Sequence, residues 1–113
     1  MIDVKSSDLH KFFESIAEQT GGPTFEEAET KFEFTTNDVY FSFIILPSKD
    51  SVLLTLKYQD QATYSLHLKD VERVYFKHQF TDSNNLAIRT RNSGFIRLKL
   101  TRFTEPYLTI EHE

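Results

Sequence analysis

The sequence predicts an α+β protein: an N-terminal helix packed on an antiparallel, meander-like sheet of about seven or eight strands. An apolar stripe with helical spacing near the N-terminus predicts the helix. From Lys31 onward, apolar residues recur at every second position, which is typical of strands. The connections between these strands are short, which favours antiparallel neighbours over helix-linked parallel ones. A chain of 113 residues fits one domain, over residues 1–113.

The helix is expected from about residue 7 to residue 20. Its apolar stripe consists of Leu9, Phe12, Phe13, Ile16 and Ala17, which fall at i, i+3, i+4, i+7 and i+8. Gly21-Gly22-Pro23 should end it, because glycine takes the terminal left-handed turn and proline cannot continue the backbone hydrogen bonds. Thr24 and Glu27 then have the spacing of a capping box, which predicts a short helical turn through about Glu29.

Strands are expected from about residue 31 to residue 112. The segment Val39 to Leu46 is apolar in both phases, which is typical of a central strand. Residues 52–58 and 62–68 should form a hairpin around Gln59–Gln61, and the final strand follows Pro106. One helix covers only part of so wide a sheet. The sheet therefore either curls into a half-barrel or leaves apolar surface for a second subunit, and we expect a homodimer.

Charge and composition limit the function classes. The net charge is −4, but residues 1–38 carry net −6 and residues 86–113 carry net +2. The absence of cysteine excludes disulfides and thiolate chemistry and is compatible with a cytoplasmic location. The longest apolar run, Phe43 to Leu46, is too short to cross a membrane.

The segment Leu86–Arg102, called the basic hairpin below, concentrates cations on one side. A three-residue loop at Asn92-Ser93-Gly94 would place residue 91 opposite 95 and residue 89 opposite 97. This register groups Leu86, Ile88, Ile96, Leu98 and Leu100 on the inner face, and Ala87, Arg89, Arg91, Phe95, Arg97 and Lys99 on the outer face.

We interpret the outer residues Arg89, Arg91, Phe95, Arg97 and Lys99 as a binding surface. Guanidinium groups pair well with carboxylate or phosphate, and the low isoelectric point argues against nucleic acid. The predicted partner is an acidic protein or a small anionic ligand, which makes the chain a non-catalytic binding or adaptor domain. Alternatively, Glu105, Glu111 or the acidic N-terminal segment neutralises these arginines within the protein.

Two other functions stay open. An aromatic pocket between helix and sheet would bind a small molecule, and its candidate residues are Phe12, Phe41, Tyr64, Phe76 and His78. His78 could also serve acid-base catalysis with a turn carboxylate such as Asp60 or Asp82, although a histidine hydrogen-bonded to Tyr64 explains it as well.

No motif predicts a metal or cofactor. The histidines show no ligand spacing, and the acidic residues around Glu27 lack the spacing and turn glycine of a calcium loop. The glycines form no phosphate-binding loop, and no serine or threonine lies in a nucleophile motif.

Overall fold

The computed structural model describes residues 1–13, 18–36, 39–58, 62–78, 83–91, 94–101 and 107–112. Along the chain the elements are β1 (Asp3–Val4), α1 (Ser6–Phe13), β2 (Glu18–Thr20), β3 (Glu29–Thr36), β4 (Val39–Leu46), the 3-10 turn η1 (Pro47–Lys49), β5 (Ser51–Tyr58), β6 (Ala62–Leu68), β7 (Val71–His78), β8 (Ser83–Thr90), β9 (Gly94–Thr101) and β10 (Tyr107–His112).

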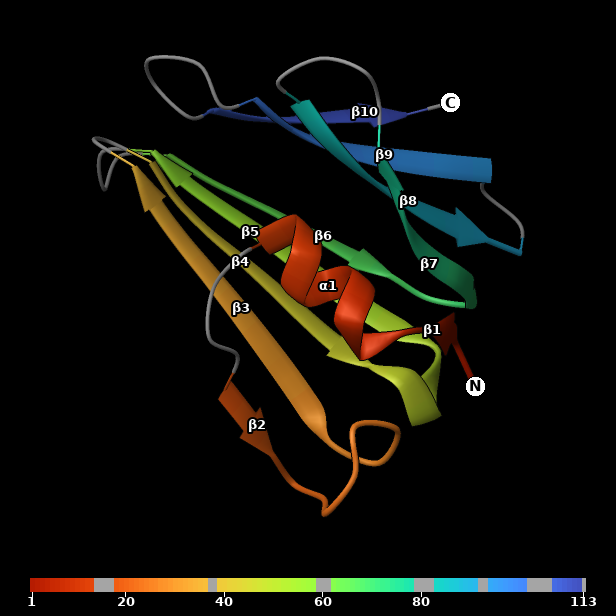
Figure 1. Ribbon diagram of the computed structural model, residues 1–113. Helices are drawn as coiled ribbons and strands as arrows, with labels where there is room; N and C mark the ends of the chain where they lie inside the picture. Colours follow the sequence, from red (N-terminus) through yellow and green to blue (C-terminus); the bar gives the residue numbers. More distant parts are fainter. Residues whose placement is uncertain are drawn as a thin grey trace.

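The strands of the described residues form two five-stranded sheets (Figure 1). The N-terminal sheet has the order β2-β3-β4-β5-β6, and the C-terminal sheet has the order β1-β7-β8-β9-β10. Every pairing is antiparallel except β1 with β7, which is parallel. The predicted α+β class, with one helix packed on an antiparallel meander, is confirmed. In the part of the chain that the structure describes, the meander is divided between two sheets, which do not close into a barrel.

The eight long strands, β3 to β10, match the segments in which apolar residues alternate. β4, predicted to be central because both its phases are apolar, is the middle strand of the N-terminal sheet. Its residues Phe41, Phe43 and Ile45 are fully buried, and Ile44 on the opposite face is half-buried. The predicted pairing of the two strands around Gln59–Gln61 is also confirmed, since Tyr58 pairs with Ala62, although the loop itself lies outside the described residues.

Helix α1 lies between the two sheets and packs against β3, β7 and β8 (Figure 1). Its residues Leu9, Phe12 and Phe13 are buried, as the apolar stripe predicted. The ring of Phe13 stacks on Phe32 of β3 at 4.9 Å between centroids and lies 5.1 Å from the ring of Phe43. Residues of both sheets and of the helix therefore share one aromatic-rich core.

The prediction that the helix runs to residue 20 is wrong at its C-terminal end. Glu18–Thr20 is strand β2, in which Glu18 pairs with Lys31 and Thr20 with Glu29. Backbone hydrogen bonds to β3 therefore replace the last helical turn, a tertiary contact that helical spacing cannot reveal. Ile16 and Ala17, predicted on the apolar stripe, lie outside the described residues.

Gly21-Gly22-Pro23 accordingly links β2 to the turn before β3. The amide of Ala28 donates to the carbonyl of Thr24 at 2.9 Å, which confirms a single helical turn at the predicted capping box. A Cβ atom on Gly22 would lie 2.8 Å from the carbonyl carbon of Glu27. Only glycine lets this turn fold back so closely.

Two aspartates with left-handed backbone angles make hydrogen bonds around the start of β7. Asp50 after η1 and Asp70 between β6 and β7 have φ angles of 53° and 55°. The Asp50 carbonyl accepts a hydrogen bond from Val71 at the start of β7, and the Asp70 carbonyl accepts one from Arg91. Aspartate tolerates this conformation better than most residues, so these positions suit the turns. The first bond connects the N-terminal sheet to β7, and the second holds the backbone of Arg91 beside the start of β7.

Candidate basic binding face

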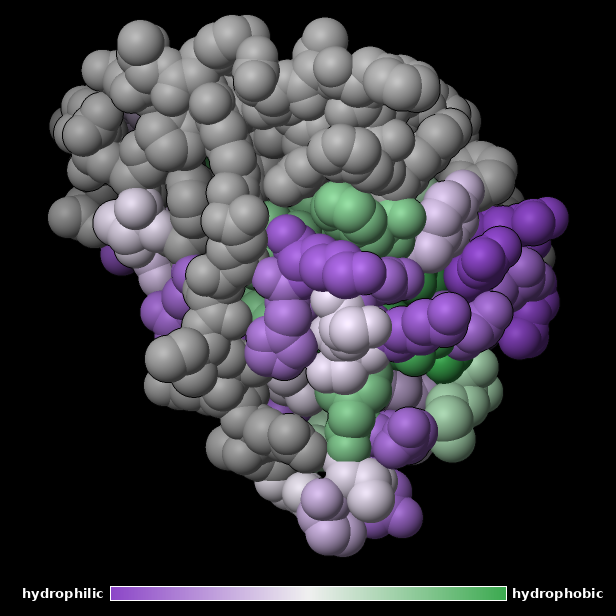
Figure 2. Space-filling view, in the orientation of Figure 1, coloured by the Kyte–Doolittle hydropathy of each residue, from purple (hydrophilic) through white to green (hydrophobic). Residues whose placement is uncertain are grey.

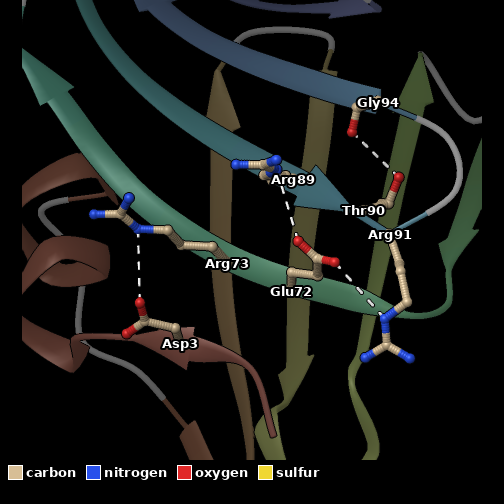
Figure 3. A network of polar contacts seen from close by, with 7 residues as sticks. All are labelled: Asp3, Glu72, Arg73, Arg89, Thr90, Arg91 and Gly94. Carbon is tan, nitrogen blue, oxygen red and sulfur yellow. Dashed lines mark hydrogen bonds and ion pairs between the residues drawn. The ribbon is translucent and has the colours of Figure 1, made fainter.

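The loop of the basic hairpin begins one residue earlier in the chain than the sequence predicted. Thr90 pairs with Gly94, so three residues separate the two strands, of which Asn92 and Ser93 lie outside the described residues. Gly94 has a φ of 78°, and the Thr90 hydroxyl donates to its carbonyl at 3.2 Å (Figure 3). The predicted pairs 91 with 95 and 89 with 97 are therefore wrong. The left-handed glycine begins β9 instead of ending the loop.

Each residue of β8 therefore pairs with a residue of β9 two positions away from its predicted partner. This change preserves the division between inner and outer faces, because side chains alternate with a period of two. Leu86 and Ile88 are fully buried and Ile96 is nearly so, which confirms the inner face for the described residues. Arg89 now lies opposite Phe95 on β9 and opposite Arg73 on β7. Arg97 instead lies opposite Ala87 on β8 and Glu111 on β10.

The outer face of the C-terminal sheet carries more cations than the hairpin alone. We define the basic face as Arg73, Lys77, Arg89, Arg91, Phe95, Arg97 and Lys99. Strand β7 contributes Arg73 and Lys77, which lie opposite Arg89 and Asn85. The sequence reasoning followed the apolar phase of β7 and missed them. The polar phase Arg73, Tyr75, Lys77 was the signal that could have found them.

The carboxylate of Glu72 lies near both Arg89 and Arg91, the two arginines of the hairpin whose side chains the structure describes. Its Oε2 lies 3.6 Å from Nε of Arg89 and its Oε1 lies 3.7 Å from Nε of Arg91 (Figure 3). The pairing register shifts between Val71 and Arg73, and this irregularity contains Glu72. The carboxylate comes from β7, a source that the sequence reasoning did not consider.

Arg73 is neutralised from the other side of the face. Its Nε lies 3.7 Å from Oδ2 of Asp3 on β1, and its guanidinium lies over the ring of Tyr75, 4.6 Å from the centroid. Like charges directly opposite each other, as Arg73 and Arg89 are, destabilise a sheet unless carboxylates compensate. Here Asp3 and Glu72 supply that compensation. Asp3 pairs with Arg73, which was not among the predicted residues, and the carboxylate beside Arg89 and Arg91 in the described part of the chain is Glu72 of β7.

These ion pairs are long and open to water. The side chains of Arg89 and Arg91 are 57 % and 59 % exposed, and that of Glu72 is 39 % exposed. Figure 2 shows hydrophilic side chains gathered over the neighbouring ends of β7 and β8. Exposed pairs of this kind contribute about 0–1 kcal/mol. A carboxylate from another molecule can therefore replace Glu72 or Asp3 at little cost.

The middle of the basic face is formed by small or neutral residues of β8. Ala87 is buried, although its phase predicted an outward position, and Asn85 is only 1 % exposed. The amide nitrogen of Asn85 is buried without a hydrogen-bond partner. By register, Asn85 lies between Lys77 and Lys99. The side chains of Lys77, Phe95, Arg97 and Lys99, like residues 102–106 with Glu105, lie outside the described part of the chain.

The five pocket candidates are distributed over different environments. Phe12 and Phe41 are fully buried in the core, and Phe76 is half-buried against it. Tyr64 on β6 is 44 % exposed. His78 pairs with Asn84 and shares the strand phase of Phe76, but its side chain lies outside the described residues, as do Asp60 and Asp82. Small-molecule binding and His78 catalysis stay predictions.

Among the described residues, no three histidine or acidic side chains converge as a metal site would require. In that same part of the chain, no helix has the length and hydrophobicity needed to span a bilayer. Comparison of the chain with protein-family models, curated proteins and solved structures finds no match.

Proposed function

We propose that this chain is a non-catalytic binding domain that docks an acidic segment of a protein partner on its basic face. The observation that carries the proposal is the exposed Arg73, Arg89 and Arg91 cluster, whose carboxylate neighbours among the described residues, Asp3 and Glu72, lie 3.6–3.7 Å away. An incoming carboxylate can form shorter, bidentate bonds with a guanidinium group. Such exchange would give the partner affinity without unfolding any part of the sheet.

The register supports an extended footprint. Cationic positions occur on β7, β8 and β9 along neighbouring rows, and Phe95 lies beside Arg89. An aromatic residue within a cationic surface suits a protein partner, because it can fill an apolar pocket while the arginines pair with acids. Nucleic acid is disfavoured, because the few cations of the basic face give only a small electrostatic footprint for a long phosphate backbone, whereas a short acidic segment needs only a few of them.

The test uses a fluorescent polyglutamate peptide and the full chain in low salt. Fluorescence anisotropy should show binding to the wild type, and the double variant Arg89→Glu/Arg97→Glu should lose at least about tenfold in affinity, about 1.4 kcal/mol. The double variant Lys31→Glu/Lys57→Glu, with the same charge change on the N-terminal sheet, is the control. Equal losses in the two variants, or no binding by the wild type, would overturn the proposal. The melting temperature of each variant, followed by circular dichroism, excludes unfolding as the cause.

A further inference from the structure

The free edge of β6 differs from the other sheet edges of the described residues. β6 ends the order of the N-terminal sheet, so one side of its backbone has no neighbouring strand in that sheet. It is seven residues long, whereas the edge strands β1 and β2 have two and three residues. β10 has six residues but carries Glu111. A long edge strand offers unpaired backbone donors and acceptors to another strand.

The edge is also open and uncharged. Thr63, Tyr64, Ser65 and His67 are exposed, and Leu66 is half-buried. Ala62–Leu68 contains no lysine, arginine, aspartate or glutamate. Proteins commonly protect such edges with charged residues or proline, and this strand has neither. The His67 ring is hydrogen-bonded to the hydroxyl of Ser51 on β5 at 2.7 Å, so it is engaged within its own sheet.

We infer that β6 pairs with β6 of a second copy of this chain, antiparallel about a two-fold axis at Ser65. Ser65 is the middle residue of Ala62–Leu68, so this register pairs the full strand. It places Tyr64 opposite Leu66 of the second copy on one face, and aromatic–aliphatic pairs stabilise antiparallel strands. On the other face, Thr63 lies opposite His67 of the second copy.

Symmetry and the absence of charge favour a second copy as the occupant, because Ala62–Leu68 pairs with itself over its full length about Ser65. Two chains of net charge −4 repel each other, and β6 is an edge where they can meet without placing like charges opposite each other within the strand. A charged partner strand would find no opposite charge along Ala62–Leu68. Two-fold symmetry is the commonest arrangement of homo-oligomers, and pairing through one strand on each side satisfies it.

The first experiment measures mass by light scattering over micromolar concentrations. The wild type should approach twice the 13.3 kDa of one chain, because two copies associate. Ser65→Lys places two like charges across the axis and should shift the mass to that of one chain. Ser48→Lys, at an exposed position of η1, should remain dimeric. A wild type that is a single chain throughout, or a Ser65→Lys variant as dimeric as the wild type, would overturn the inference.

The second experiment locates the contact. The chain has no cysteine, so Ser65→Cys introduces a single thiol. On mild oxidation it should form a covalent dimer, whereas Ser48→Cys should not. A dimeric Ser65→Cys chain that fails to cross-link faster than Ser48→Cys would place the contact elsewhere and reject β6. Polyglutamate binding should be unchanged in Ser65→Lys, so this inference and the proposed function fail independently.

Discussion

The two sheets share one core but have different outer faces. On the N-terminal sheet, Lys31 and Glu33 form an ion pair within one strand at 3.1 Å, opposite Ile44 and Ser42 of β4, and Lys31 also pairs by register with Glu18 of β2. On the C-terminal sheet, Arg73 and Arg89 lie opposite each other and depend on carboxylates from other positions, Asp3 and Glu72. A locally paired charge is satisfied by its own strand. A cluster that depends on tertiary neighbours can exchange them, and this makes the basic face the better candidate for binding.

The largest expected effect concerns the shared core. Phe43→Ala removes a fully buried ring of β4 that contacts Phe13 of α1, and it should lower the free energy of unfolding by about 3–5 kcal/mol. Urea denaturation measures this loss. Probes of the two sheets should report one transition, because both pack on the same helix.

Tyr64→Ala is the matched control, since that aromatic residue is 44 % exposed whereas Phe43 is fully buried. It should cost under half as much as Phe43→Ala. If Phe43→Ala unfolds the N-terminal sheet while the C-terminal sheet keeps its wild-type stability, the idea of one shared core fails.

A smaller effect distinguishes the outer faces. Glu72→Gln removes the carboxylate that pairs with Arg89 and Arg91, and it should change the free energy of unfolding by less than about 1 kcal/mol. It should also tighten polyglutamate binding, because two arginines lose their internal competitor. Anisotropy titrations of Glu72→Gln beside Glu33→Gln provide the comparison. Equal tightening in both variants would show that net charge alone, and not the basic face, governs binding.

The smallest expected effect is on the pKa of Lys31. The hydrogen bond from Lys31 to Glu33 raises the pKa of the lysine above its ordinary value of 10.5, with a further contribution from the nearby Tyr40 hydroxyl. A raised pKa means that the pair stabilises the fold below pH 10.5, and this contribution is lost as the pH rises through the folded value. NMR titration of Lys31 in Glu33→Gln should show the pKa moving down toward the ordinary value. In Glu26→Gln it should stay raised, and an equal decrease there would remove Glu33 as the cause.

The sequence predicted most of the strand pattern because alternation is a local property. The eight long strands and the central place of β4 followed from it. The end of the helix did not follow from a local pattern. Glu18–Thr20 pairs with β3 through backbone hydrogen bonds, and the helical spacing of the apolar residues does not indicate this contact. The basic hairpin shows the same limit, since the inward positions of Leu86, Ile88 and Ile96 were predicted correctly while the burial of Ala87 and the partner of Arg89 were not.

By itself, then, the sequence determined the apolar face of the helix and of the long strands, since a period of two or 3.6 residues assigns each residue to a face whatever its partner. It also determined that cations gather near the C-terminus. Only the tertiary structure decided that the strands divide into two sheets, that β7 adds Arg73 and Lys77 to the basic face, and that Glu72 is the carboxylate between Arg89 and Arg91. These outcomes depend on contacts between residues far apart in the chain, and no local pattern encodes which distant residues meet.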